Sequence, residues 1–482
     1  MGKRRVCMRI KKRISALVAF MMIFVTVVSL LTIPASALNF NTGIDLHSES
    51  VYMYNMDTGE VVVSIRASEQ RVPASLTKIM TCVIVLDYYK NDLSLLETTK
   101  VSGGVNAFEE LWGTGCSTAD IRMDEEVSYY DLLHALMIPS GCEAANIIAI
   151  NLAGSIDAFV NRMNSKAREL GMTNTHFSNA HGLFAENNYT SCEDMAKLCE
   201  YAIEEYPLFS EIVSKPTYKM AATTEHPNGT TIINTNKMLQ VGSEYYYSYA
   251  SGIKTGNLNE AGRCLASTAT KDGMTYMIVT MGAPSKDENG NSTMYNCEDH
   301  VNLYTWAFSQ LEYPDPPVLS ADSEITDIDV RYGDERTKIN LKPKTGFECL
   351  WPKAQQIYES DSAEVKAYKQ SIEKVTDIKK KIVLKEDVVA PVNKGDVLGY
   401  VELTYNGNSL AKIDLIATES VERSVLKEKK DIAKSFWQSA HFKIVVAVVA
   451  IIVAAYLVVF ILVIRSKTAK KKKRRKKPAN RK

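Results

Sequence analysis

Acidic residues are absent from both ends of this 482-residue chain. Residues 1–37 carry seven Lys/Arg and residues 465–482 carry twelve, without one Asp or Glu. The middle then holds 38 basic against 56 acidic residues, a net charge of −18. Because phosphate attraction needs a basic surface, this balance argues against nucleic acid as a partner of the middle portion.

The chain also has no Cys-x-x-Cys pair and no internal repeat at solenoid periods. The first absence leaves a zinc site without support, and we expect no metal and no cofactor. The second argues against a repeat architecture. With 46% apolar and 23% charged residues, the composition is that of a globular protein with room for two or three domains, not of a disordered or multi-span one.

The N-terminus has the pattern of a secretory signal. Basic clusters precede an apolar run from Ile14 to Ile33, and Ala35-Ser36-Ala37 forms an A-x-A site. We expect residues 1–37 to be a signal peptide that is cleaved after Ala37. The apolar run is longer than usual, so an uncleaved anchor is the alternative. Export permits disulfides among the eight later cysteines, with free buried thiols as the other possibility.

The C-terminus has the pattern of a membrane span. Ile444–Ile464 is 21 residues long without a charge, and a helix of that length crosses a hydrocarbon core of about 30 Å. The basic tail 465–482 stays cytoplasmic under the positive-inside rule. We therefore expect a single-pass cell-membrane protein whose main part is extracytoplasmic, joined to the span by a charged stalk at 419–443.

Strand patterns begin and end the segment 38–312, and helical patterns lie between them. Hairpins are predicted at residues 51–64 and, around Asp272-Gly273, at 263–281, and helices after Pro73, from Ser128, and at 143–153 and 156–170. This order predicts an α+β domain with an antiparallel sheet and a helical layer. A Pro-rich linker, 313–324, leads to a small β-rich domain, 325–418.

Three short motifs occur in one order within the first domain. They are Ser75-x-x-Lys78 at a helix start, Ser140-Gly141-Cys142 between two helices, and Lys254-Thr255-Gly256 before the late hairpin. Each alone is weak, and Ser75 with Lys78 alone would be a helix cap and a solvated lysine. Together they predict a nucleophile site, because Lys78 lies three residues from Ser75 on one helix face. A lysine beside a second cation loses pKa and becomes a general base.

These motifs give a family resemblance. With the flanking residues 73–78, 171–173, 179–183 and 251–256, the chain resembles the D-alanyl-D-alanine carboxypeptidases, the low-molecular-mass penicillin-binding proteins. The resemblance covers about residues 45–310, and the segment 390–395 is similar to that family's C-terminal β domain. It implies a serine β-lactamase-like α+β fold, with peptidoglycan stem peptides and β-lactams as binding partners.

The resemblance also implies residue roles. Ser75 would be the nucleophile, Lys78 its base, and Ser140 the proton relay to the leaving D-alanine. Lys254 and Thr255 would hold the substrate's terminal carboxylate.

The family's oxyanion hole would use the backbone N–H groups of Ser75 and of Asn257, which follows Gly256. His181 would lie beside the cleft, with either a structural or a functional role.

One residue departs from the family pattern. The middle motif usually ends in Asn, and here it ends in Cys142, which would still contact the substrate. A thiol is a weaker hydrogen-bonding group than an amide, so the loss costs about 1–3 kcal/mol and slows acylation without abolishing it. Asn146, one turn later, is expected to serve packing instead.

Two other functions remain open from the sequence. A class A-like β-lactamase shares the motifs but needs a deacylating glutamate, and no E-x-x-L-N segment lies between Ser140 and Lys254. A penicillin-binding or wall-anchoring protein weakened through Cys142 is the second.

Overall fold

The computed structural model describes residues 40, 42–353, 378–405 and 408–474. It divides into two compact units: the residues up to Val318 with the segment from Glu348, and Leu319–Phe347 with the residues from Ile378 onward. The predicted signal peptide, residues 406–407 of the predicted β-rich domain and the end of the basic tail lie outside the described residues.

The first unit is built on a five-stranded antiparallel sheet. Its order is β2 (Val61–Ile65), β1 (Ser50–Asn55), β9 (Met274–Ala283), β8 (Gly262–Lys271) and β7 (Lys254–Leu258). Both predicted hairpins are confirmed. Asp272 and Gly273 both have positive φ, 53° and 79°, which fits the tight turn that D-G favours.

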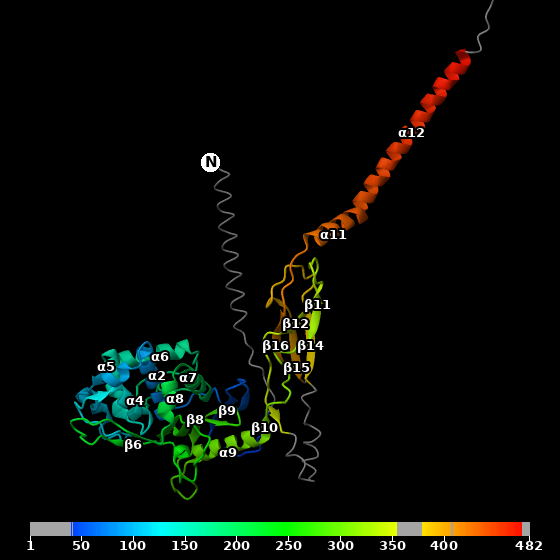
Figure 1. The fold of residues 1–482 in the computed structure, drawn as a ribbon. Coiled ribbons are helices and arrows are strands. Elements are labelled where there is room, and N and C mark those ends of the chain that lie inside the picture. The colour runs from blue at the N-terminus through cyan, green and yellow to red at the C-terminus, as the bar shows by residue number, and fades with distance from the viewer. Residues whose placement is uncertain (1–39, 41, 354–377, 406–407, 475–482) are drawn as a thin grey trace, which may run out of the picture. The chain divides into compact units, whose positions relative to one another are not determined.

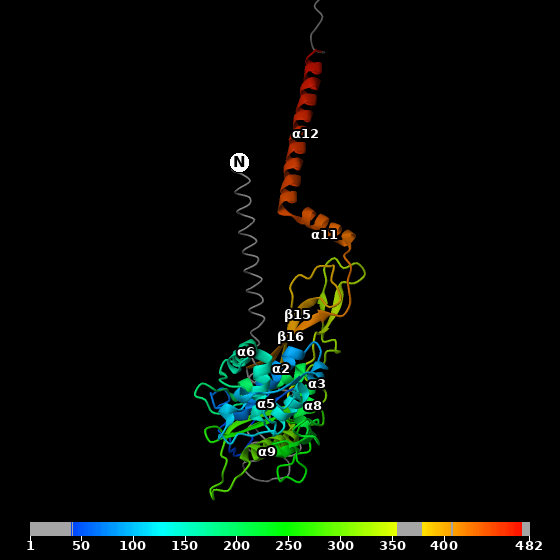
Figure 2. The ribbon, with the colours of Figure 1, turned by 90° about the vertical axis from the view of Figure 1, so that its left-hand side faces the viewer.

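Alternate side chains of β9 serve two cores. Met277 and Val279 point into the helical layer, while Tyr276 and Ile278 pack with helix α9 (Tyr295–Gln310). Figures 1 and 2 show α9 on the opposite side of the sheet from α2. Because both faces are covered, β9 is buried along nearly its whole length.

The four predicted helices are all present in the main layer, as α2, α4, α5 and α6. The layer contains η1 (Ala74–Leu76), α2 (Thr77–Tyr89), α4 (Tyr129–Met137), α5 (Cys142–Ala153), α6 (Ile156–Glu169), α7 (Cys192–Glu205) and α8 (Pro207–Ser214). Ser128 caps α4 by accepting a hydrogen bond from the Asp131 N–H at 3.1 Å. Helices α7, α8 and α9 were not predicted.

Shorter elements complete the first unit. They are α3 (Leu95–Thr98), β3 (Lys100–Val101), η2 (Val105–Ala107), η3 (Glu109–Leu111), β4 (Val127–Ser128), β5 (Thr217–Lys219), β6 (Thr231–Ile233), η4 (Lys237–Leu239), β10 (Leu311–Glu312) and β13 (Trp351–Pro352).

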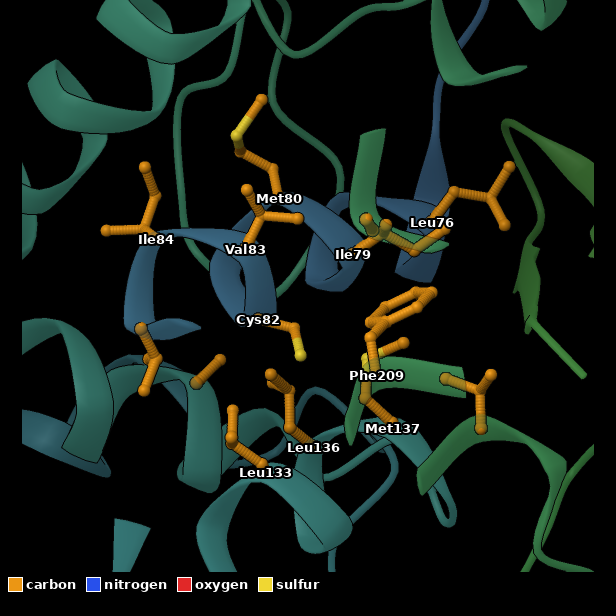
Figure 3. Packing of buried hydrophobic residues seen from close by; sticks show 14 of the residues in the cluster. Leu76, Ile79, Met80, Cys82, Val83, Ile84, Leu133, Leu136, Met137 and Phe209 are labelled. Atoms are coloured by element: carbon orange, nitrogen blue, oxygen red, sulfur yellow. The ribbon is translucent and has the colours of Figure 1, made fainter. Parts of the chain in front are cut away.

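Helix α2 runs through the centre of the helical layer. Every side chain from Thr77 to Leu86 is buried, including the polar Thr77, Lys78 and Thr81. Figure 3 shows Cys82 pointing from α2 toward Leu136 and Met137 of α4. This packing holds in a fixed position the N-terminal end of α2, which carries Lys78 and follows Ser75 of η1.

The second unit contains the predicted β-rich fold. Its antiparallel sheet has the order β11 (Thr326–Asp329), β12 (Lys338–Pro343), β16 (Asn408–Ala417), β15 (Val397–Tyr405) and β14 (Lys379–Leu384). Leu341, Leu403 and Leu415 are buried within the unit.

Two helices follow this sheet. Helix α11 (Val425–Gln438) lies within the predicted stalk, and helix α12 (Ala440–Arg474) contains the predicted span Ile444–Ile464. Ala440–Thr468 is long and apolar enough to cross a membrane, and its apolar side chains are exposed. It is a candidate membrane anchor.

Candidate active site

All three motifs meet at one cleft of about 470 Å³ in the first unit. Its walls include Ser75, Ser140, Cys142, Thr255, Gly256 and Asn257. The two motif lysines lie behind the wall, since Lys78 is 0% exposed and Lys254 is 1% exposed. The sequence-predicted residues are therefore brought together from η1, α2, the turn before α5, and β7.

Lys78 is tied to the nucleophile candidate. Its Nζ donates to Ser75 Oγ at 3.0 Å, to the His181 carbonyl oxygen at 2.5 Å and to Cys142 Sγ at 3.5 Å. A buried amine held this close to a hydroxyl can take its proton when the amine is neutral. The arrangement can therefore activate Ser75.

Lys254 is the second buried lysine at the cleft. Its Nζ donates to the Thr255 carbonyl oxygen at 3.2 Å. Burial, and secondly the charge of Lys78, place the pKa of Lys254 well below its ordinary value. Since two buried ammonium groups repel each other, the neutral form of Lys254 is favoured.

Ser140 has an unusual backbone and a free hydroxyl. Its φ is +72°, a left-handed conformation that costs a non-glycine residue about 1–3 kcal/mol. Its Oγ is buried and has no hydrogen-bond partner within the part of the chain that the structure describes. A buried hydroxyl that lacks a partner in the cleft wall can bond an incoming ligand.

Two glycines allow neighbouring chain segments to pack closely against the backbone around Ser75. A Cβ on Gly182, whose φ is +85°, would clash with the Ala74 carbonyl oxygen. A Cβ on Gly256 would lie 3.1 Å from Ala74 Cβ and 3.2 Å from the Pro73 oxygen. Gly182 needs to be glycine because η1 passes so close to it at a positive φ, and Gly256 has little room for a side chain beside η1.

His181 contacts Lys78 through its backbone and Glu110 through its ring. Its Nδ1 accepts from the Leu183 N–H at 3.1 Å, so Nε2 carries the proton and donates to Glu110 Oε1 at 3.0 Å. Burial lowers the pKa of His181, which favours this neutral form. Its carbonyl fixes Lys78, a structural role that the sequence had left open.

Asn146 has the packing role that was expected. Its Nδ2 donates to the Ala107 carbonyl oxygen at 3.1 Å and to Glu110 Oε1 at 2.8 Å. The Asn146 amide thus anchors the segment beside Glu110.

Sequence reasoning missed several residues in the cleft wall. They include Cys116, Ser117, Thr235 and Arg263. Thr235 Oγ1 lies 2.5 Å from Thr255 Oγ1. None of the four belongs to a motif, and the chain gives no spacing signal that would have identified them.

Arg263 brings a cation to the open side of the cleft. It lies on β8 opposite Asn257 of β7. Its Nη2 donates to Ser292 Oγ at 2.9 Å, while its Nε is buried and has no partner among the described residues. A guanidinium with a spare donor suits a carboxylate.

An antiparallel sheet, a helical layer and three motifs that converge on one cleft define a serine β-lactamase/penicillin-binding-protein-like catalytic domain. Residues 36–285 match the profile of the Peptidase S11 family, described as D-alanyl-D-alanine carboxypeptidase, and residues 313–423 match that of the C-terminal domain of penicillin-binding protein 5. The chain therefore belongs to the D-alanyl-D-alanine carboxypeptidase family.

Curated relatives agree along most of the chain. The D-alanyl-D-alanine carboxypeptidase DacF of Bacillus subtilis is 28% identical over 378 residues, which is 78% of this chain and 86% of DacF. DacA of Escherichia coli K12 is 27% identical over 424 residues, 86% of this chain and 93% of DacA.

A solved structure supports the fold. Penicillin-binding protein 5 from Haemophilus influenzae matches with a TM-score of 0.60 at 24% identity, over 79% of this chain and 99% of that one. The family resemblance, the fold class and the serine-type carboxypeptidase expectation are confirmed by these findings, and the β-lactamase and weakened-protein alternatives are not favoured.

Proposed function

We propose that this protein removes the terminal D-alanine from peptidoglycan stem pentapeptides through an acyl-enzyme on Ser75, and that β-lactams acylate the same serine. The observation that carries the proposal is the 3.0 Å contact between Ser75 Oγ and the buried Lys78 Nζ, in a cleft that Ser140 and Thr255 also line. Family membership supports the substrate class.

Acylation depends on the groups that surround the Ser75 hydroxyl. Lys78 takes the proton of Ser75, whose oxygen attacks the carbonyl carbon of the penultimate D-alanine. The backbone N–H groups of Ser75 and Asn257 face the developing oxyanion. Ser140 passes a proton to the departing amine, and water then hydrolyses the acyl-enzyme to release the shortened peptide.

The substrate's terminal carboxylate is held from two directions. The Thr255 hydroxyl and the Arg263 guanidinium contact it from the cleft walls, and Lys254 Nζ donates to the Thr255 carbonyl oxygen from behind the wall. Gly256 leaves room beside η1, and Cys142 contacts the substrate's amide.

Penicillin tests this proposal. Incubation of the protein with penicillin is expected to give a stable covalent adduct, which peptide mass spectrometry locates on Ser75 and which Ser75→Ala lacks. An adduct that survives in Ser75→Ala would remove Ser75 from the mechanism. Rapid turnover of penicillin would instead favour a β-lactamase.

We also propose a membrane topology. The α12 span crosses the cell membrane once, the basic tail lies in the cytoplasm, and the catalytic domain lies outside, where peptidoglycan is found. The exposed apolar side chains of Ala440–Thr468 and the twelve basic residues of the tail 465–482 support this orientation. The division at 38–312, 313–324 and 325–418 is part of the same proposal.

A further inference from the structure

His226 joins two segments of the first unit that lie far apart in the sequence. It lies in the connection 220–230 between β5 and β6, and its ring contacts the segment 114–125. Its Nδ1 lies 2.9 Å from Glu125 Oε1, and its Nε2 lies 3.3 Å from Asp120 Oδ2. The two ring nitrogens therefore connect the β5–β6 hairpin to two carboxylates of one other segment.

Both segments continue into the wall of the catalytic cleft. The segment 114–125 contributes residues 114–117 to the wall. The hairpin contributes Ile233, the last residue of β6, and the two residues that follow it, Asn234 and Thr235. Thr235 Oγ1 lies 2.5 Å from the hydroxyl of Thr255, which is proposed to hold the substrate's carboxylate. The contact at His226 thus joins two parts of the wall against which the substrate binds.

The hydrogen bonds of the ring require its protonated form. Ionised carboxylates only accept hydrogen bonds, so both nitrogens of His226 must carry a proton to bond Glu125 and Asp120. Glu125 is 3% exposed, and a buried carboxylate is costly unless it is paired and hydrogen-bonded. The Thr223 hydroxyl and the Arg122 N–H donate to Glu125, and the ring of His226 supplies the cation.

The charged groups around the ring favour the same form. The hydrogen bond with Glu125 raises the pKa of His226 above its ordinary value of 6.5, with further help from Asp120 and against the effect of burial. The Arg122 guanidinium lies on the other side of Asp120, 2.8 Å from its Oδ1. Glu225 is the other charged residue of the connection 220–230. Negative charge therefore predominates near the ring, which stabilises the imidazolium.

The two segments differ in what else holds them. Glu143 Oε1 at the start of α5 accepts from the Ala119 N–H at 2.6 Å, which fastens the segment 114–125 to the helical layer. The hairpin tip contacts this segment through Thr223 and His226, which bond the same oxygen of Glu125. Loss of the cation would therefore loosen the hairpin and leave the segment 114–125 in place.

We propose that protonated His226 is a positioning residue for the catalytic cleft: it holds the β5–β6 hairpin against the segment 114–125, and the cleft binds substrate less tightly when the ring is neutral. The proposal rests on the proposed function, because it concerns the substrate of that reaction. His226 lies outside the lining of the cleft and acts through Ile233 and Thr235 at the end of the hairpin.

The effect on the cleft has one direction with pH. Because the folded protein favours the imidazolium, the contact is complete at acidic pH and is lost as the pH rises through the raised pKa of His226. Burial opposes the ionisation of Glu125, but hydrogen bonds, first that of Thr223, hold its pKa below the ordinary value. Glu125 therefore stays ionised over this range, and the ring is the group that changes.

The test compares the full-length wild type in detergent with His226→Asn, which has no cation, and His226→Arg, which keeps one at every pH. Labelled penicillin reports the rate of acylation at about pH 6 and at about pH 9. At the lower pH, His226→Asn should react about fivefold more slowly than the wild type, and His226→Arg should stay within about twofold of it. At the higher pH, the wild type and His226→Asn should converge, because both then lack the cation. Each ratio is taken at one pH, so the titration of other cleft groups cancels.

Hydrogen exchange measured by mass spectrometry reports the contact without any substrate. At the lower pH, peptides that cover residues 217–235 should exchange faster in His226→Asn than in the wild type, and this difference should disappear at the higher pH. His47→Asn is the matched control, since His47 lies 4.0 Å from Glu298 and outside the cleft wall. It should change neither acylation nor exchange in residues 217–235.

Three results would overturn the proposal. They are equal acylation by the wild type and His226→Asn at the lower pH, a defect of His226→Asn that is the same at both pH values, and faster exchange with unchanged acylation. If His226→Asn does not fold, Asp120→Asn takes its place, because Asp120 is 51% exposed, and it too should speed exchange at the lower pH. A missing Ser75 adduct in the wild type at both pH values would be a failure of the proposed activity, and the exchange data would then decide the role of His226.

Discussion

Cys142 touches both the base and the place where the substrate's amide would lie. Its Sγ is 3.5 Å from Lys78 Nζ, and its thiol is a poor hydrogen-bond partner for an amide. We predict that Cys142→Asn raises the rate of acylation by penicillin up to about tenfold, equal to about 1.4 kcal/mol of transition-state binding. Stopped-flow acylation rates of the two folded proteins measure this effect.

Cys142→Ala is the control for this substitution. It removes the sulfur without adding an amide, so its acylation rate should not exceed that of the wild type. An unchanged or lower rate for Cys142→Asn would mean that the pocket is built around the thiol, since Asn is larger than Cys and the site is 2% exposed.

Arg263 is predicted to select substrates with a free terminal carboxylate. Arg263→Leu should raise the KM for a stem pentapeptide at least tenfold and should change little for the same peptide with an amidated C-terminus, because only the first loses an ion pair. Steady-state hydrolysis of both peptides by the wild type and by Arg263→Leu measures the change in KM for each peptide.

Lys237→Met offers a comparison for Arg263→Leu. Lys237 also lines the cleft, but its Nζ already donates to Gln240 Oε1 at 2.9 Å. Loss of the Lys237 charge should therefore leave the preference for a free terminal carboxylate unchanged. Equal losses for both peptides in Arg263→Leu would show that Arg263 only supports the fold.

Residues whose relation is local could be predicted from the sequence. Ser75 and Lys78 are three residues apart at a helix start, and the structure places Lys78 Nζ 3.0 Å from Ser75 Oγ. Cys116 and Arg263 could not be predicted, because loop and sheet geometry alone bring them to the cleft. The chemistry expected at Cys142 stays a prediction.

At the scale of elements, the position of η1 depends on the close approach of the segment that contains Gly182. Gly182→Ala would place a Cβ against the Ala74 carbonyl oxygen at a φ of +85°. We predict a loss of about 3 kcal/mol in the free energy of unfolding and at least a tenfold slower acylation, since Ala74 precedes Ser75. Urea denaturation and penicillin acylation measure the two effects.

Gly171→Ala is the matched control for this prediction. Its φ is also positive, +68°, but an added Cβ meets nothing within 4 Å. It should cost about 1 kcal/mol and leave acylation unchanged. If the two variants behaved alike, the close approach at η1 would not matter.

Elements with a local signal were predicted, and those that depend on tertiary contacts were not. The D-G turn and the Ser128 cap gave the β8–β9 hairpin and α4. Helix α7 has a comparable cap, in which Ser191 accepts from the Asp194 N–H at 3.2 Å, and this signal was overlooked. Helix α9 mixes buried polar residues such as His300 with apolar ones, and its place follows from the sheet face that it covers.

At the scale of the whole molecule, the account requires an anchor that salt cannot release. We predict that washing membranes with 1 M salt leaves the protein bound, while detergent extracts it, because salt screens surface charge and does not remove an apolar helix. Immunoblots of the pellet and the supernatant give the result.

Protease added outside intact cells tests the orientation. It should release the catalytic domain and leave an epitope on the basic tail protected. Release of the whole protein by salt, or digestion of the tail, would contradict the proposed topology.

The central claim is that Ser75 removes one D-alanine from a stem pentapeptide. Mass spectrometry of the pentapeptide after incubation with wild-type protein and with Ser75→Ala tests it most directly. The account predicts a tetrapeptide and free D-alanine with the wild type and intact pentapeptide with Ser75→Ala. An intact pentapeptide with folded wild-type protein, or equal release by Ser75→Ala, would contradict it.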